Sequence, residues 1–398
     1  RREGAPKSAE FSMDPNDVDK IFREATWEEA LDVATNGFNK IRDNQGPNAL
    51  AGFGSAKGSN EEAYLFQKLV RTGFKTNNVD HCTRLCHASS VVALLECLGS
   101  GAVSNPVSDV DKADVLVIIG ANPTVNHPVG ATWMKNAMRR GTKLILMDPR
   151  TTELSREATH HVAFKLGSDV PMLNAMMHTI IEENLVDPEF IKERTEGFEA
   201  MKAHLKAYTP EMMEPICGVP AETLKEVARL YAKAGAAMSI WTMGINQSTH
   251  GSDGVVGINS LNLITGNIGK PGGTSLSITG QCNAMGTREW SSCSGLPGYR
   301  LLEKPEHRKE IADFWGIDEE FFPKKRGLAQ TDIFSAIESG EIKGLWLVAT
   351  NPMTSMPNTA RTRKILEKLE FLVIQDAYAD VETTQYAHMF LPAAVWAE

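Results

Sequence analysis

The fold is decided by the run Val115-Leu116-Val117-Ile118-Ile119-Gly120-Ala121-Asn122-Pro123. Its first five residues are apolar and mostly β-branched, which predicts a strand buried on both faces. A helical stretch is expected through Met134 to Arg140, ended by Gly141. A second strand, Lys143–Met147, then closes on Asp148-Pro149-Arg150. The pattern predicts a βαβ unit whose terminal Asp148 can bond a ribose or a guanine edge.

The same order of elements returns near the end of the chain. A strand is expected over Leu345–Ala349, before Thr350-Asn351-Pro352, and a helix over roughly Thr359–Leu369. The strand Phe371–Gln375 then ends on Asp376. Any doubly wound protein contains several βαβ units, so one such match would carry little information. Two copies with an Asn-Pro turn and a terminal Asp at nearly equal spacing predict two related nucleotide sites.

Glycine-rich loops lie between the two copies, at 266–273 and 279–286. Glycine allows backbone N–H groups to approach phosphate oxygens or a flat heterocycle. Neither loop is a P-loop, because no Gly-Lys-Ser/Thr closes it. The segment Met243–Gln247, after a strand expected at Ala237–Trp241, has a similar composition. Gly167-Ser168-Asp169 offers further polar donors, and alone it could also be a helix N-cap.

The composition is that of an ordinary globular protein. The 398 residues are 42% hydrophobic and 23% charged, so we expect two or three domains with sizeable cores. A net charge of −9 predicts no general affinity for nucleic acid or anionic membranes. No apolar run approaches the roughly 20 residues that span a bilayer, and no signal peptide opens the chain, so we expect no membrane insertion and a cytoplasmic location. Because the chain starts at Arg1 without Met and stops directly after an apolar stretch, we expect a segment truncated at both ends.

The cysteines are scattered, and one of them is followed by a histidine. None forms a Cys-x-x-Cys pair, so their spacing builds neither a zinc ribbon nor an iron–sulfur cluster, and reduced thiols are expected. An isolated cysteine is most often a small core residue. Cys86 differs because a thiolate is a soft metal ligand and the adjacent His87 can take or give a proton. The six positions are Cys82, Cys86, Cys97, Cys217, Cys282 and Cys293.

With these motifs, the chain resembles the molybdenum or tungsten bis-pterin guanine dinucleotide oxidoreductases, which include formate dehydrogenases and nitrate reductases. The likeness runs from Trp27-Glu28-Glu29-Ala30 to Leu391-Pro392-Ala393-Ala394. The segment Gly54–Glu62 matches the family's segment ahead of the metal ligand, and its Ser59 and Glu62 also form a capping box for a helix through Val70. Two guanine dinucleotide arms on this cofactor would account for the repeated βαβ unit.

The resemblance divides between two activities. Cys86 aligns with the family's metal ligand, and Cys-His at this point is similar to formate dehydrogenases, where the histidine assists the proton step; in nitrate reductases Met typically follows the cysteine. Residues 278–289 instead resemble assimilatory nitrate reductases. Thr279 stands where formate dehydrogenases carry the arginine that holds the carboxylate, and threonine cannot make a charge-assisted fork. Arg288 is either a substitute for that arginine or a scaffold charge.

The resemblance also implies an architecture. We expect an α/β fold with two Rossmann-like doubly wound domains: a discontinuous domain of residues 1–80 plus 282–398, and an inserted domain of residues 81–281. Cys86 would lie near their junction, where they would enclose the cofactor. The four cysteines of an N-terminal 4Fe-4S cluster and the C-terminal barrel domain of the family are not in this sequence, so both are expected only in a longer parent.

The leading prediction is a catalytic segment of a formate dehydrogenase that oxidises formate to carbon dioxide, with Cys86 as metal ligand and His87 as proton relay. The alternatives are nitrate reduction, another metal–pterin reaction, or a non-catalytic relative like the large structural subunit of respiratory complex I. An electron-transfer partner subunit is expected. Cys82 is interpreted as a packing residue, and His127, His160, His161 and His250 as structural histidines or cofactor contacts. The predicted cofactor-binding residues are Asn122, Pro123, His127, Asp148, Arg150, Ser168, Asp169, Met243, Gly244, Gln247, Gly280, Gln281, Asn283, Thr350, Asn351, Gln375 and Asp376.

Overall fold

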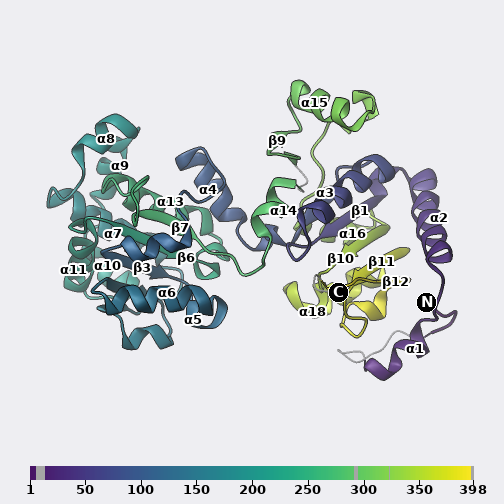
Figure 1. Ribbon diagram of the computed structural model, residues 1–398, viewed down its shortest axis with the longest axis horizontal. Coiled ribbons are helices and arrows are strands. Elements are labelled where there is room, and N and C mark those ends of the chain that lie inside the picture. The colour runs from purple at the N-terminus through teal and green to yellow at the C-terminus, as the bar shows by residue number, and fades with distance from the viewer. Residues whose placement is uncertain (6–13, 291–294, 322, 396–398) are drawn as a thin grey trace. The chain divides into compact units, whose positions relative to one another are not determined.

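The computed structural model describes residues 1–5, 14–290, 295–321 and 323–395, and its chain forms two compact units (Figure 1). Unit 1 comprises Arg1–Arg84 and Gln281–Glu398, and unit 2 comprises Leu85–Gly280. Cys293 lies outside the described residues. Within the described ranges, no helix has both the length and the apolar character that a bilayer-spanning helix needs.

Unit 2 contains a five-stranded parallel sheet with the order β5-β4-β3-β6-β7. The chain moves outward from β3 through β4 to β5, then returns and moves through β6 to β7 on the other side. This reversal makes a topological switch point between β3 and β6, as in doubly wound nucleotide-binding folds. The strands are β3 (Val115–Ile119), β4 (Lys143–Met147), β5 (His160–Val162), β6 (Ala237–Trp241) and β7 (Thr274–Ser277).

Helices cover both faces of this sheet. Val115, Val117 and Ile119 pack into one apolar cluster with side chains of α4, α7, α11 and α13. Leu116 and Ile118 pack into another cluster with Met134 and Ala137 of α6. Burial on both faces is the reason that the β3 sequence is continuously apolar. The helices of unit 2 are α4 (Ala88–Leu98), α5 (Pro123–Asn126), α6 (Pro128–Arg139), α7 (Asp169–Glu182), α8 (Pro188–Arg194), α9 (Phe198–Leu205), α10 (Pro210–Cys217), α11 (Ala221–Ala232), α12 (Met243–Asn246) and α13 (Gly251–Ile264).

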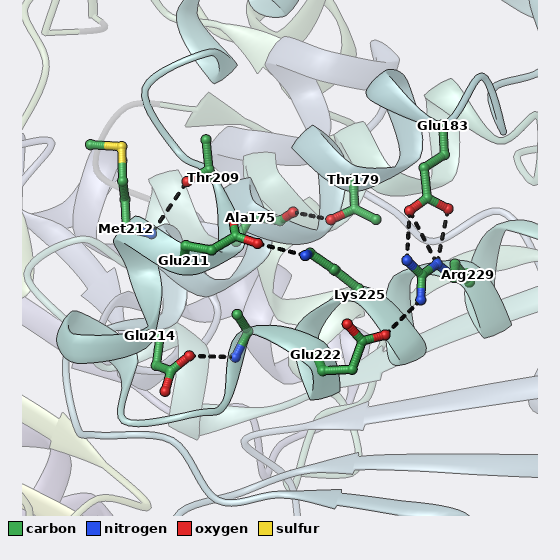
Figure 2. A network of polar contacts seen from close by, with 11 residues as sticks. Ala175, Thr179, Glu183, Thr209, Glu211, Met212, Glu214, Glu222, Lys225 and Arg229 are labelled. Atoms are coloured by element: carbon green, nitrogen blue, oxygen red, sulfur yellow. Dashed lines mark hydrogen bonds and ion pairs between the residues drawn. The ribbon is translucent and has the colours of Figure 1, made fainter.

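A network of ion pairs joins α7, α10 and α11 on the outside of unit 2, and Figure 2 shows it. Arg229 of α11 donates to both carboxylate oxygens of Glu183 at 2.8–3.1 Å and to Glu222 at 2.9 Å. The hydrogen bonds from Arg229 lower the pKa of Glu183. Lys225 pairs with Glu211 of α10 at 2.5 Å. Exposed ion pairs of this kind each contribute little to stability, so the network links the three helices without adding much to the free energy of unfolding.

Unit 1 contains a second five-stranded parallel sheet, with the order β12-β11-β10-β1-β2. Its strands come from both ends of the sequence, and its switch point lies between β1 and β10. This is the other common doubly wound order, in which the second strand lies beside the first at one edge. The predicted doubly wound α/β fold is therefore confirmed. The strands are β1 (Leu50–Gly54), β2 (Val79–His81), β10 (Gly344–Val348), β11 (Phe371–Asp376) and β12 (Met389–Pro392).

The sheet of unit 1 is also covered on both faces. Leu345, Leu347 and Leu372 pack with side chains of α16 and α18, whereas Leu50, Val79 and Val373 pack with side chains of α2. The predicted capping box is present at the start of α3, where Ser59 accepts from the backbone of Glu62 and the Glu62 side chain accepts from that of Ser59. The helices are α1 (Val18–Ile21), α2 (Trp27–Gln45), α3 (Asn60–Leu69), α14 (Ala284–Trp290), α15 (Pro305–Trp315), α16 (Gln330–Ser339), α17 (Pro352–Ser355) and α18 (Thr359–Glu367); β8 (Gly295–Leu296) and β9 (Arg300–Leu301) form an antiparallel pair.

Short helical turns connect these elements. They are the 3-10 turns Pro15–Asp17, Pro47–Ala49, Cys82–Leu85, Val107–Lys112, Glu153–Arg156, Glu319–Phe321 and Thr384–Tyr386, and the π-helical turn Val70–Phe74.

Candidate active site

The switch point of unit 2 is a place where two backbone segments touch. Gly120 directly follows β3 with a φ of +58°, and its carbonyl accepts hydrogen bonds at 3.0 Å from the Gly244 N–H and from the Thr242 hydroxyl. A Cβ on Gly120 would stand 2.8 Å from the Cα of Gly244. Only glycine fits this contact. The carboxyl ends of β3 and β6 thus carry polar backbone groups at the position where ligands of such sheets bind.

The predicted repeat of the Asn-Pro turn is present in the backbone. Asn122 has φ and ψ of −123° and 75°, and Asn351 has −119° and 83°. Two residues before each asparagine, Gly120 and Ala349 both have positive φ, +58° and +49°. Their N–H groups donate to the neighbouring strand, to Met147 at 3.0 Å and Gln375 at 2.8 Å. A four-residue helix follows each turn, so both switch points carry the same local structure.

The predicted aspartates also occupy equivalent places. Asp148 accepts a hydrogen bond from the Arg150 N–H at 2.8 Å, and Asp376 accepts one from the Tyr378 N–H at 3.1 Å. Each carboxylate therefore caps its own turn. Burial raises the pKa of Asp376. Since a carboxylate accepts several hydrogen bonds, this cap leaves capacity for a further donor such as a guanine edge.

The two turns differ in their side-chain contacts. The Asn351 amide donates to Glu382 and accepts from the Thr383 hydroxyl, both at 2.5 Å. Asn122 instead accepts from the Thr124 hydroxyl at 2.9 Å. The amide of Asn351 is thus engaged within the protein on both of its atoms, so the repeat extends to the backbone and not to the asparagine side chains.

His87 directly precedes α4 and is fully buried in unit 2. Its Nδ1 lies 2.9 Å from Asn246 Nδ2 and 2.7 Å from the Ser277 hydroxyl. Ser90, one turn into α4, donates from its hydroxyl to Asn246 Oδ1 at 2.6 Å. Cys86, the predicted metal ligand, is partly buried in the same segment. The sequence analysis missed Asn246, Ser90 and Ser277; the only signal for them was their position beside predicted site residues or at the end of a strand.

Cys82 belongs to unit 1 and has a structural environment. Its sulfur accepts the Ala56 N–H at 3.2 Å, and its side chain packs against the core cluster of β10 and α16. Its predicted packing role is confirmed. Cys82 and Cys86 do not share a helix face, although four residues separate them, because Cys82–Leu85 is a 3-10 turn and α4 begins only at Ala88. The Asp80–Arg84 ion pair, at 2.8 Å, braces this turn.

The other predicted residues are divided between the two units and have different environments. Burial raises the pKa of Asp169, which lines a pocket of about 250 Å³ with Ser248 and His250. Ser168 occupies the N-cap position of α7 but donates to the Lys165 carbonyl at 2.6 Å and makes no cap bond. Two of the remaining predicted residues donate hydrogen bonds within their own unit: Gln247 to the Leu85 carbonyl at 2.7 Å, and Asn283 to Gly58 and Asn60 at 3.0 Å. Arg150 is exposed and lies 3.8 Å from Asp148. Of the others, Pro123 is buried, Met243, Gln281, Thr350 and Gln375 are half-buried, and Gly244 and Gly280 are exposed.

The histidines divide between structural and open roles. His127 Nε2 lies 2.5 Å from the Thr279 carbonyl, and its buried Nδ1 has no hydrogen-bond partner in the part of the chain that the structure describes. His161 Nε2 lies 3.0 Å from the Asp148 carbonyl. The exposed His250 lies 3.3 Å from Asp253. A buried nitrogen normally has a partner, so the Nδ1 position of His127 suits a polar ligand.

Comparison with known proteins agrees with this fold. The Molybdopterin oxidoreductase family model matches residues 18–398, and the chain belongs to that family. It is 39% identical to the F420-dependent formate dehydrogenase subunit alpha of Methanocaldococcus jannaschii, over 95% of this chain and 54% of the relative. It is 35% identical to the nitrate reductase of a Synechocystis species, over 98% of this chain and 55% of the relative. The chain thus spans about half the length of the curated relatives it matches.

A solved structure shares the fold. Acetylene hydratase from Pelobacter acetylenicus superposes with a TM-score of 0.76 at 21% identity, over 98% of this chain and 55% of that one. At this identity the likeness concerns the fold alone.

Family membership implies a molybdenum or tungsten bis-pterin guanine dinucleotide, and the described residues fit such a group. At the switch point of unit 2, Gly120 and Gly244 keep the carboxyl ends of β3 and β6 in contact without side chains between them. His127 presents a buried nitrogen that needs a partner. Within the described ranges no three His, Cys, Asp or Glu side chains gather to hold a metal on their own. A single cysteine ligand, as predicted for Cys86, suits a metal whose other ligands come from the cofactor.

Proposed function

We propose that this chain carries the catalytic site of a formate dehydrogenase, which oxidises formate to carbon dioxide, two electrons and a proton. The observation that supports this most is the pair Cys86-His87, with the His87 imidazole buried and held by Asn246 and Ser277. The 39% identity to an archaeal formate dehydrogenase subunit alpha agrees with it.

In this proposal each unit would hold one nucleotide arm at its own switch point. Unit 2 would use the turn at Asn122 with Asp148, and unit 1 the turn at Asn351 with Asp376. Cys86 would bind the metal through its thiolate. When bound, the cofactor supplies an acceptor for two electrons.

His87 would act on the substrate through Nε2, because Asn246 and Ser277 engage Nδ1. An imidazole beside the metal ligand can either donate a hydrogen bond to the substrate anion or take its proton. The name "subunit alpha" of the archaeal relative supports an electron-transfer partner subunit as part of the proposal.

Nitrate reduction is the second candidate. It is favoured by the resemblance of residues 278–289 to assimilatory nitrate reductases, in which Thr279 replaces the arginine typical of formate dehydrogenases, and by the 35% identity to a nitrate reductase. The two candidates differ in the direction of electron flow: nitrate takes two electrons and two protons to give nitrite and water.

Steady-state kinetics of the cofactor-loaded whole protein with formate and a redox dye, and with nitrate and a reduced dye, would decide between them. We expect saturable formate oxidation. Nitrate reduction without any formate turnover would overturn the leading proposal and establish the second candidate.

A further inference from the structure

A chain of hydrogen bonds leads from a buried tryptophan to His87, and its direction is fixed at the start. The Trp241 indole N–H can only donate, and it donates to the Ser90 hydroxyl at 2.8 Å. With its oxygen accepting from the indole, the Ser90 hydroxyl donates to Asn246 Oδ1 at 2.6 Å. Trp241 and Ser90 are fully buried, and Asn246 is only 4% exposed, so water does not compete for these groups.

The orientation of the Asn246 amide is fixed by backbone groups on both of its ends. Oδ1 accepts the Ser90 N–H at 3.2 Å, and Nδ2 donates to the Thr242 carbonyl at 3.1 Å. In a flipped amide, Nδ2 would face the Ser90 N–H, which is also a donor, and Oδ1 would face the Thr242 carbonyl, which is also an acceptor. The second hydrogen on Nδ2 is then left for His87 Nδ1, 2.9 Å away.

His87 Nδ1 must therefore accept. A proton on Nδ1 would face the amide N–H of Asn246, whose direction the backbone has already fixed. The Ser277 hydroxyl, 2.7 Å from Nδ1, can rotate to donate or to accept and so does not determine the tautomer. The Ser90 hydroxyl, 3.4 Å from Nδ1, gives its hydrogen to Asn246 and does not donate to His87. Asn246, at 2.9 Å, is the nearer group of fixed polarity, and we expect it to determine the tautomer.

We propose that Asn246 is the positioning residue of His87 and holds its neutral imidazole with the proton on Nε2. The inference rests on the proposed function and deepens it: His87 enters the reaction as a hydrogen-bond donor to the substrate anion, and not as the base that takes the proton of formate. A neutral donor at this place offers the carboxylate a partner, whereas Thr279 provides no cation. The same donor would suit nitrate.

The tautomer is measured directly by NMR of the two ring nitrogens in chain labelled with ¹⁵N-histidine, at a pH where imidazole is neutral. The His87→Gln variant assigns the signals. We expect Nε2 to be protonated in the wild-type chain. In Asn246→Asp, which exchanges the donor at Nδ1 for an acceptor of the same shape, we expect the proton on Nδ1. Ser277→Ala should leave the proton on Nε2, since Ser277 does not fix it.

Asn262→Asp is the matched control, because Asn262 is an equally buried asparagine of unit 2 that bonds Ser239 and Ile258 instead of a histidine. Its His87 signals should match those of the wild-type chain. If Asn246→Asp does not fold, Asn246→Ala should give a mixture of tautomers. A wild-type proton on Nδ1, or an Asn246 variant with unchanged signals, would overturn the inference.

Kinetics of the loaded protein separate this inference from the proposed function. We expect Asn246→Asp to lower formate turnover about 10- to 100-fold, as is usual when a group supporting an active-site histidine is lost. If the wild-type protein turns over formate but its His87 carries the proton on Nδ1, the role of Asn246 would be overturned and the proposed function would stand. The opposite result is also informative. If the proton moves from Nε2 to Nδ1 in Asn246→Asp but the wild-type protein does not turn over formate, the positioning role of Asn246 would be supported and the proposed function would be contradicted.

Discussion

Gly120 and Gly99 both have positive φ, but only Gly120 has a neighbour where a Cβ would stand. Alanine at Gly99 meets open space, so its cost is the strain of a left-handed residue, about 1–2 kcal/mol. Alanine at Gly120 adds a contact with the backbone of Gly244. We expect Gly120→Ala to lower the free energy of unfolding by about 1–3 kcal/mol more than Gly99→Ala in urea denaturation. Equal losses would show that the backbone contact at the switch point is not tight.

Asp376 makes stability depend on pH, since burial raises its pKa. An acid with a higher pKa in the folded chain favours folding while protonated, and this advantage is lost as the pH rises from the unfolded value, about 3.8, through the folded pKa. Asp376→Asn can still accept the Tyr378 N–H but cannot ionise. We expect the free energy of unfolding of Asp376→Asn, relative to wild type, to rise as the pH increases from about 3.8 through the folded pKa of Asp376.

Asp109 provides the control of opposite sign. Hydrogen bonds from Lys112 and Asn105 lower the pKa of Asp109, so its contribution to stability is present above the unfolded pKa and is lost as the pH falls. Asp109→Asn should therefore lose stability relative to wild type as the pH rises from the lowered folded pKa to the unfolded value, about 3.8, which is below the window of Asp376. Parallel curves for Asp376→Asn and wild type would contradict the assigned effect of burial.

At the scale of elements, the two Asn-Pro turns test how far the repeat determines local structure. Ala349 adopts a φ of +49° at the place that Gly120 holds in the other copy. The left-handed region costs a non-glycine residue about 1–2 kcal/mol, and glycine itself costs about 0.5–1 kcal/mol of chain entropy. We expect Ala349→Gly to raise the free energy of unfolding by about 0.5–1 kcal/mol. Ala360→Gly, in the exposed first turn of α18, should lower it by about 1 kcal/mol, and a loss in both variants would contradict the strain at Ala349.

The elements that could be predicted are those whose sequence carries a local pattern. β3, β4 and β6 have the predicted bounds because their apolar runs are buried on both faces. The strand predicted to reach Ala349 ends one residue earlier, at Val348, because Ala349 turns into the left-handed region. The predicted helix through Met134 extends back to Pro128, where a second proline after Pro123 separates α6 from α5.

The rest of the candidate site could not be predicted from local pattern. Asn246, Ser90 and Ser277 belong to three segments distant in sequence, and only the completed sheet brings them to His87. Taken alone, each of them is indistinguishable in the sequence from an ordinary polar residue in a helix or at a strand end. Resemblance to a family could identify Cys86 and His87, but not the hydrogen bonds that orient His87.

At the scale of the whole molecule, the proposed metal ligand can be tested against a cysteine four residues away. Cys86→Ala removes the proposed thiolate, so we expect the loaded protein to lose turnover and to retain less metal, as measured by elemental analysis. Cys82→Ala removes a packing side chain and the acceptor of the Ala56 N–H, so its effect should be mild and mainly on stability. Equal loss of turnover and metal in both variants would contradict the assignment of Cys86.

The choice of substrate anion depends on Thr279, whose side chain carries no charge. Its carbonyl lies 2.5 Å from His127 Nε2, and a side-chain substitution leaves that carbonyl in place. A charge-assisted hydrogen bond is worth about 1.5–3 kcal/mol, which corresponds to roughly 10- to 150-fold in affinity. If formate is the substrate, Thr279→Arg should lower the KM for formate by up to this factor, because a guanidinium can hold both carboxylate oxygens.

Thr279→Gln separates charge from size, since glutamine is longer than threonine but neutral. It should leave the KM for formate within a few-fold of wild type, and steady-state kinetics with formate and with nitrate on the three proteins would measure the difference. An unchanged KM in Thr279→Arg would mean that position 279 does not face the carboxylate. A guanidinium attracts either anion, so only turnover distinguishes the substrate. If Thr279→Arg lowers the KM for nitrate and no formate turnover is found, nitrate would be the anion that binds beside this residue.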